Sequence, residues 1–164
     1  MRWLMARGVS IQGDGVDESP LLGTCFIGHV DAARALVELG ADVRYRGRQG
    51  FTALHWMVCC GKEEVALEMT RLLLAAGADA NAANAHNRAP LHFVRHAACV
   101  DLLLDAGADL EARDELGMTP IGVAASDFPH TAEAVLRLAD RGADLVNTGR
   151  EAGLVDCIVA ELRA

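Results

Sequence analysis

The sequence predicts an all-α fold in which similar helix-turn-helix units stack side by side into a solenoid. Two short phrases recur four times each along the chain of 164 residues. Hydrophobic residues make up 52% of the chain and aromatic residues only 4%, so the core must be built mainly from Ala, Leu and Val. Small side chains let helices pack closely, which favours a helical fold.

The first phrase is Gly-Ala-Asp, which closes each unit at residues 40–42, 77–79, 107–109 and 142–144. The second phrase has the form Ser/Thr-Pro-Leu-His, with substitutions, and opens each unit at residues 19–22, 52–55, 89–92 and 119–122. The period is uneven, with a longer second interval and a shorter third one. A unit of this size cannot bury an apolar face alone, so the pattern predicts that neighbouring units stack.

Each unit is expected to hold two helices joined by a turn. The opening hydroxyl, as at Thr52 and Thr119, can accept hydrogen bonds from free backbone N–H groups in the first helical turn. Proline at the next position suits that turn, because its missing N–H matters little there. Glycine in the closing phrase supplies the left-handed conformation that ends the second helix, at Gly40, Gly77, Gly107 and Gly142. A hairpin-like loop then leads to the next unit.

The two linked phrases and their period resemble the ankyrin repeat, from about residue 4 to residue 146. The resemblance implies one domain, divided into a partial repeat (1–13), four repeats (14–46, 47–83, 84–113 and 114–146) and a C-terminal capping helix (147–164). It also implies that the family histidine, here His55 and His92, is structural and bridges the opening Thr and the neighbouring loop backbone. Leu22 and Gly122 replace this histidine, so the loops at both ends should be less firmly tied.

The units differ in length. The stretch from Thr52 to Gly77 is longer than the one from Ser19 to Gly40, which predicts one extra turn in a second helix over residues 63–75. The stretch from Ala89 to Gly107 is the shortest, which predicts clipped helices joined near residues 96–98. In the fourth unit, residues 126–130 indicate an enlarged turn. The apolar face of residues 151–162 predicts the capping helix.

Both ends of the repeat pattern carry further expectations. Gly8 is interpreted as the helix stop of the partial first repeat, with Trp3 and Leu4 partly exposed. A homodimer through this half-repeat is an alternative to the expected monomer. Asp17 and Asn87 stand where the family loop carries glycine, as at Gly50 and Gly117, and Asp and Asn tolerate left-handed backbone.

Charge and cysteine usage exclude several classes of function. The net charge is −8 with a single Lys, and no Lys/Arg cluster is present, so nucleic-acid binding is not expected. No apolar run is long enough for a secretory signal or a membrane span, so no membrane association is expected. Five cysteines without a secretory signal indicate reduced thiols and a cytoplasmic protein.

No motif predicts catalysis. Cys59 and Cys60 are adjacent on a helix and point in different directions, and no second cysteine pair has zinc-ligand spacing. No serine has a Gly-x-Ser-x-Gly context, and no glycine-rich loop precedes a helix to hold phosphate. We therefore expect no enzyme activity, no cofactor and no metal site.

Partners of ankyrin proteins usually contact the loop tips and the concave face of the first helices. The implied tip positions are Val16, Glu18, Arg48, Gln49, Phe51, His86, Arg88, Glu115, Leu116 and Met118. The ends of the first helices add Phe26, Ile27, Cys59, Cys60, His96, Ser126 and Asp127. Phe51 and Met118 are expected to be exposed apolar anchors, with Arg48 and Arg88 giving polar register.

These patterns favour a protein–protein interaction module. A dedicated inhibitor or immunity protein that occludes an enzyme or toxin is the main alternative, because a small acidic array suits a basic target. An enzyme or small-molecule binder ranks last, because no polar constellation converges on a pocket.

Overall fold

The structure, a computed structural model, describes residue 12, residues 19–146, residue 148 and residues 152–164. Within these residues the chain forms helices and turns and no strand, which confirms the predicted all-α solenoid. The elements are α2 (Pro20–Ile27), α3 (Val30–Glu38), η1 (Arg48–Gly50), α4 (Ala53–Val58), α5 (Glu63–Ala75), η2 (Pro90–Phe93), α6 (Ala97–Asp105), α7 (Pro120–Ser126), α8 (Ala132–Asp140) and α9 (Ala152–Arg163).

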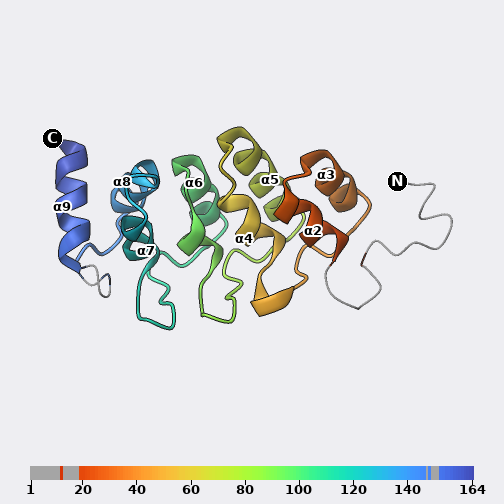
Figure 1. Cartoon of the computed structure of the whole chain (residues 1–164), viewed down its shortest axis with the longest axis horizontal. Coiled ribbons are helices and arrows are strands. Elements are labelled where there is room, and N and C mark those ends of the chain that lie inside the picture. Colours follow the sequence, from red (N-terminus) through yellow and green to blue (C-terminus); the bar gives the residue numbers. More distant parts are fainter. Residues whose placement is uncertain (1–11, 13–18, 147, 149–151) are drawn as a thin grey trace.

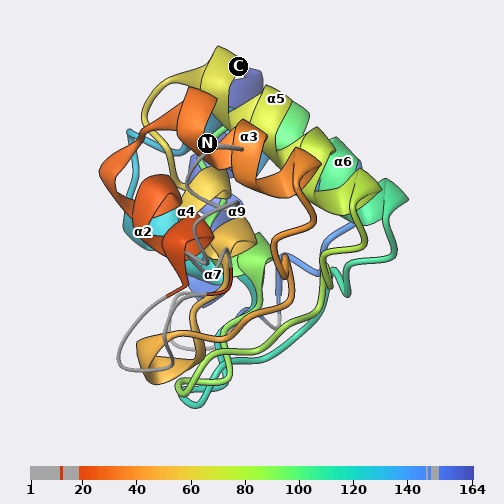
Figure 2. The ribbon, with the colours of Figure 1, turned by 90° about the vertical axis from the view of Figure 1, so that its right-hand side faces the viewer.

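The helices form two parallel rows (Figure 1). We call α2, α4, η2 and α7 the first helices of the units, and α3, α5, α6 and α8 the second helices. Seen along the row, the loops between units project away from the helices to one side (Figure 2). The last helix, α9, packs against α7 and α8 and covers the end of the stack. No helix in the described part of the chain is both long and apolar enough to cross a membrane.

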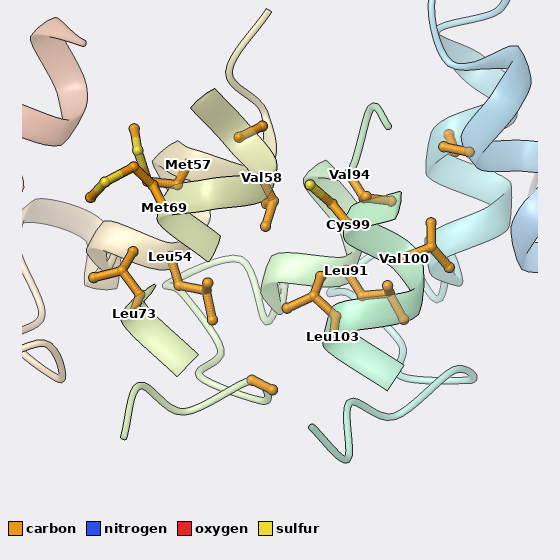
Figure 3. Close-up of a cluster of buried hydrophobic side chains, with 14 of the residues drawn as sticks. Leu54, Met57, Val58, Met69, Leu73, Leu91, Val94, Cys99, Val100 and Leu103 are labelled. Atoms are coloured by element: carbon orange, nitrogen blue, oxygen red, sulfur yellow. The ribbon is translucent and has the colours of Figure 1, made fainter. Parts of the chain in front are cut away.

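The core lies between the two rows and runs from unit to unit (Figure 3). It consists of buried aliphatic and sulfur-containing side chains, among them Leu54, Met57, Met69, Leu73, Leu91, Val94, Cys99 and Leu103. Burying a side chain of this size stabilises the fold by about 1.5–3 kcal/mol relative to leaving it exposed. Because every unit shares this core with its neighbours, the stability of each unit depends on the units beside it.

The helix lengths follow the unequal units. Helix α5 spans Glu63–Ala75, as predicted. In the third unit the first helix is reduced to the four residues of η2, a 3-10 turn. The chain is extended at Val94 (ψ 135°) and at His96 (ψ 134°), and α6 then begins at Ala97. An enlarged turn separates α7 from α8, also as predicted.

Glycines with left-handed backbone end the second helices. The φ angle is 85° at Gly40, 90° at Gly77, 85° at Gly107 and 94° at Gly142. After α3, the Gly40 N–H donates to the Val37 carbonyl and the Ala41 N–H donates to the Leu36 carbonyl, each at 2.9 Å. These bonds satisfy carbonyls that the helix end would otherwise leave free.

Buried histidines tie the second unit to the third, and the third to the fourth. Nδ1 of His55 accepts from the Thr52 N–H at 3.1 Å, and its Nε2 lies 3.1 Å from the Arg88 carbonyl in the next loop. His92 contacts the Ala89 N–H and the Met118 carbonyl in the same way, at 3.2 and 3.3 Å. Because Nδ1 accepts, the proton is on Nε2, which donates to the next unit's backbone.

In the first and fourth units another residue stands at the position of the buried histidine. The Leu22 side chain packs where a Cβ on Gly47 would otherwise lie, so the first contact is apolar. Gly122 has no side chain, and the Thr148 carbonyl oxygen occupies the space of its missing Cβ. The chain leading to α9 therefore rests directly on the backbone of α7. The expectations for Trp3, Leu4, Gly8, Val16, Asp17 and Glu18 fall outside the described residues.

Candidate functional site

The loop tips form a linked series in which each tip bonds to the next. The Gln49 carbonyl accepts from the Ala85 N–H at 2.7 Å, and the His86 carbonyl accepts from the Glu115 N–H at 3.0 Å. Gln49 and Asn87 both have φ of 55°, so two non-glycine residues adopt left-handed backbone at these turns. The tips are therefore held in a fixed register relative to one another.

Several predicted contact residues are exposed on these tips. Arg48 and Gln49 lie in η1, and both are exposed. His86 Nδ1 lies 2.8 Å from Glu115 Oε1, with each side chain about half exposed. Leu116 is 48% exposed and is the one large apolar residue on the described tips with that degree of exposure. The structure thus places these five residues where a partner could reach them.

Two other tip residues make contacts within the loops, and the expected exposure of one of them, Met118, is wrong. Met118, expected to be an exposed anchor, is only 7% exposed, because the loop folds back over it. Asp114 Oδ1 accepts from the Met118 N–H at 2.9 Å. Arg88 Nε donates to Asp114 Oδ2 at 2.9 Å, so the arginine is partnered within the loop.

The buried Asp114 carboxylate organises this turn. Desolvation raises its pKa, but hydrogen bonds from the Met118 N–H, Arg88 and the Leu116 N–H outweigh that effect and hold the pKa below its ordinary value. Asp114 is therefore ionised at neutral pH and fixes the shape of the fourth unit's tip.

An aromatic cluster lies on the first-helix side. Trp56 is stacked on Phe51 with ring centroids 4.8 Å apart, and the Phe26 ring meets Trp56 edge-on at 4.8 Å. Phe93 extends this series of contacts, with its ring centroid 5.5 Å from that of Phe51. Phe26 is 62% exposed and its neighbour Ile27 is 67% exposed. Phe51, expected to be an exposed anchor, is half-buried because it packs in this cluster.

Phe93 also lines a shallow recess between α4 and α7, together with Cys59 and Val123. We call Phe26, Ile27, Phe51, Trp56, Cys59, Phe93 and Val123 the apolar row. Its ring contacts join residues of the first three units, and Val123 belongs to the fourth unit. The other predicted helix-end residues lie within a few positions of members of this row. Two of them, Cys60 and His96, are half-buried, and the other two, Ser126 and Asp127, are exposed.

Sequence reasoning did not assign Trp56, Phe93 or Val123 to this surface. Each of them directly follows the position of the family histidine, at residues 55, 92 and 122. That register is a signal available in the sequence, because the same position is half-buried in all three units. Trp56 is half-buried and also packs against the core.

Charge is distributed unequally between the two rows. Helices α2, α4, η2 and α7 contain no Asp, Glu, Lys or Arg. The second helices carry exposed charged side chains, namely Asp31, Glu38, Glu63, Glu64, Glu68, Arg71, Asp105, Glu133, Arg137 and Asp140. The first helices themselves thus add no charged side chain to the surface of this acidic protein.

Four buried histidine and cysteine side chains have shifted pKa values with structural causes. Burial lowers the pKa of His55 to about 4 and also lowers that of His92, and both rings are occupied by backbone contacts. Burial raises the pKa of Cys25 to about 12 and of Cys99 to about 11, so both are protonated thiols and poor nucleophiles. Among the residues described, no three His, Cys, Asp or Glu side chains are grouped to hold a metal ion.

Comparison with known proteins identifies the repeat. A family model of ankyrin repeats in three copies matches residues 1–84, and a single ankyrin-repeat model matches residues 86–115. "Ankyrin repeat and SOCS box protein 6" of Homo sapiens is 31% identical over 157 residues, which cover 89% of this chain and 36% of that protein.

Two further relatives match shorter stretches. "E3 ubiquitin-protein ligase KEG" of Arabidopsis thaliana is 37% identical over 105 residues, covering 59% of this chain and 6% of that protein. "B-cell lymphoma 3 protein homolog" of Mus musculus is 38% identical over 85 residues, covering 48% and 18%. The chain thus spans at most 36% of the length of these relatives. With the matching family models and the observed stack of helix pairs, this chain belongs to the ankyrin-repeat family.

Proposed function

We propose that this chain binds a partner protein through the apolar row, with the adjoining loop tips as a polar rim. Ankyrin repeats are protein–protein interaction modules, and the proposal concerns which surface is used. The observation that carries it is the continuous series of ring contacts from Phe26 through Trp56 and Phe51 to Phe93. Phe51 lies in the loop before α4, and the other three rings lie on helices that contain no charged residue.

Exposed aromatic and aliphatic residues that touch one another are typical of protein-binding surfaces. Aromatic residues also contribute a large share of binding energy when a partner excludes water from them. Phe26 and Ile27 are the most exposed members of the row, and the core of the fold does not require either of them to be apolar. Their exposure is therefore best explained by a partner.

The loop tips supply polar contacts at the edge of this surface. Arg48, Gln49, His86, Glu115 and Leu116 are exposed there. Rim residues of this kind set orientation and salt dependence more than affinity. Met118 and Arg88 are excluded from the proposed surface, because the first is buried and the second is held by Asp114.

The test is capture of proteins from a lysate of the source cells on the immobilised chain. The double substitution Phe26→Glu/Ile27→Glu places two charges in the row at positions that are more than 60% exposed. We expect it to reduce capture of the specific partner by about tenfold or more, because buried unpaired charge is costly at an interface. Far-UV circular dichroism should be unchanged.

Leu154→Glu is the matched control, since Leu154 is an exposed apolar residue on α9, away from the row. Capture that is insensitive to the double substitution but lost with Leu154→Glu would contradict the proposal. The identity of the captured protein also separates the functional classes. A single enzyme or toxin bound in stoichiometric amount favours an inhibitor, and several unrelated proteins favour a general adaptor.

A further inference from the structure

The shortened third unit leaves a recess in the first-helix side. The neighbouring first helices α4 and α7 have six and seven residues, whereas η2 has four. After η2 the chain is extended and lies against the end of α4. The Arg95 N–H donates to the Val58 carbonyl at 3.4 Å, and His96 Nε2 lies 2.8 Å from the Cys60 carbonyl. These contacts fix the extended segment against the end of α4.

The resulting recess has a volume of about 260 Å³. Its lining comes from the second, third and fourth units and consists of Cys59, His92, Phe93, Val94, Arg95, Val123, Ala124, Asp127 and Thr131. Its apolar lining includes Val94, which is only 2% exposed. Its two charged side chains form an ion pair of 3.4 Å between Arg95 Nη2 and Asp127 Oδ2 and remain accessible to water.

We propose that this recess receives one large apolar side chain of the partner protein, carried on an uncharged segment. The inference rests on the proposed function and specifies the chemistry of the partner at one point of the surface. Sites for free small molecules usually occupy roughly 300–1,000 Å³, so a recess of this size suits a single side chain better than a separate ligand.

Charge complementarity determines the character of the occupant. Arg95 and Asp127 neutralise each other at the recess, and the helices on either side carry no charge. A charged group placed here would lose hydration without gaining an opposite charge, which is unfavourable. An apolar side chain loses nothing of this kind, and it also shields the ion pair from water.

The test selects displayed random twelve-residue peptides on the full-length chain. Enriched peptides are expected to share one large apolar residue in an uncharged segment, and replacing it with Ala should weaken binding about tenfold or more. Val123→Arg, which fills the recess with a long charged side chain, should weaken binding to the same degree. Leu154→Arg is the matched control on α9 and should leave binding unchanged.

A second readout uses the unmodified recess. Cys59 lies in its wall and is half-buried, so a bound peptide should slow alkylation of the Cys59 thiol in a Cys60→Ala background. Alkylation of the exposed Cys157 should keep its rate. This readout remains decisive if Val123→Arg fails to fold, which far-UV circular dichroism would reveal.

Several outcomes would overturn the inference. They are the enrichment of no peptide, unchanged binding to a folded Val123→Arg variant, and unchanged alkylation of Cys59 in the presence of saturating peptide. Peptides whose binding is lost in Phe26→Glu/Ile27→Glu but kept in Val123→Arg would overturn the inference about the recess. They would leave the proposed function standing. Peptides sensitive to neither variant would contradict both.

Discussion

The first and second helices of the units are built for different tasks. The first helices are short, from four to eight residues, and contain no Asp, Glu, Lys or Arg. The second helices have nine to thirteen residues and carry acidic and basic side chains on their outer surface. The two rows therefore differ in both helix length and surface chemistry.

The difference has a physical cause. A helix of four to eight residues is not stable alone, because nucleation costs more than so few hydrogen bonds return. The first helices of the second and third units depend on buried histidines that satisfy backbone groups at their N-termini. The longer, amphipathic second helices contribute buried side chains to the core and charged side chains to the surface. The first helices can therefore expose apolar side chains.

The largest effect is expected from removing a histidine tie. His55→Ala leaves the Thr52 N–H and the Arg88 carbonyl without their partner and opens a void, and it should lower the free energy of unfolding by about 2–4 kcal/mol. Urea unfolding followed by circular dichroism measures this loss. His86→Ala, at an exposed loop tip, should change stability by no more than about 0.5 kcal/mol. Equal losses in the two variants would refute a special role for the first-helix ties.

Acid should weaken the same tie in the unmodified protein. Burial lowers the pKa of His55 from 6.5 to about 4, so the unfolded chain takes up a proton before the folded one does. Stability from this group is full above pH 6.5 and is lost as the pH falls toward 4. Between pH 7 and about pH 4.5 the cost of His55→Ala should shrink by roughly 2–3 kcal/mol. A cost that does not depend on pH would show that His55 is not neutral and buried as described.

The third prediction concerns the fourth unit, where Gly122 replaces the histidine and the backbone contact with Thr148 replaces the hydrogen bonds of the ring. Gly122→Ala places a methyl group against the Thr148 carbonyl oxygen, and the resulting displacement should cost about 1–3 kcal/mol. The loss should appear as faster amide exchange in α9, which packs on α7. Gly153→Ala, in α9 with nothing close to its added Cβ, should be neutral or stabilising. Unchanged exchange in α9 with Gly122→Ala would mean that this backbone contact does not hold the helix.

The smallest effect on stability is expected from the surface ion pairs of the second helices. Arg141 donates to Asp101 at 2.7 Å and to Asp105 at 2.9 Å, and these acidic groups raise its pKa. Such surface pairs contribute little, so Arg141→Ala should change thermal stability only slightly. The difference should nearly disappear in about 0.5 M salt, which screens exposed charges. A large, salt-resistant loss in thermal unfolding experiments would assign the second helices a greater electrostatic role.

Much of the fold could be predicted from the sequence. The recurring phrases define the fold class, and their unequal spacing predicts the long α5, the clipped third unit and the enlarged fourth turn. These features are local, because chain length between fixed phrases sets helix length. The packing of Thr148 on Gly122 was not predictable, because it depends on how the chain returns after the last unit.

The candidate surface was predicted less well, because exposure depends on neighbouring units. Leu116 is exposed at a tip, but Met118, two positions later, is buried, and Asp114 accepts a hydrogen bond from its backbone N–H. Phe51 and Trp56 look independent in the sequence and stack together only in the folded unit. Whether the predicted residues bind a partner stays a prediction.

Side-chain footprinting of the captured complex tests the central claim most directly. Hydroxyl radicals oxidise side chains according to their exposure, so a bound partner protects the residues it covers. The account predicts slower oxidation of Phe26, Trp56 and Phe93 in the complex, with unchanged rates at Leu67 on α5 and Leu154 on α9. Protection of Leu67 or Leu154, with Phe26 and Trp56 oxidised as fast as in the free chain, would contradict it.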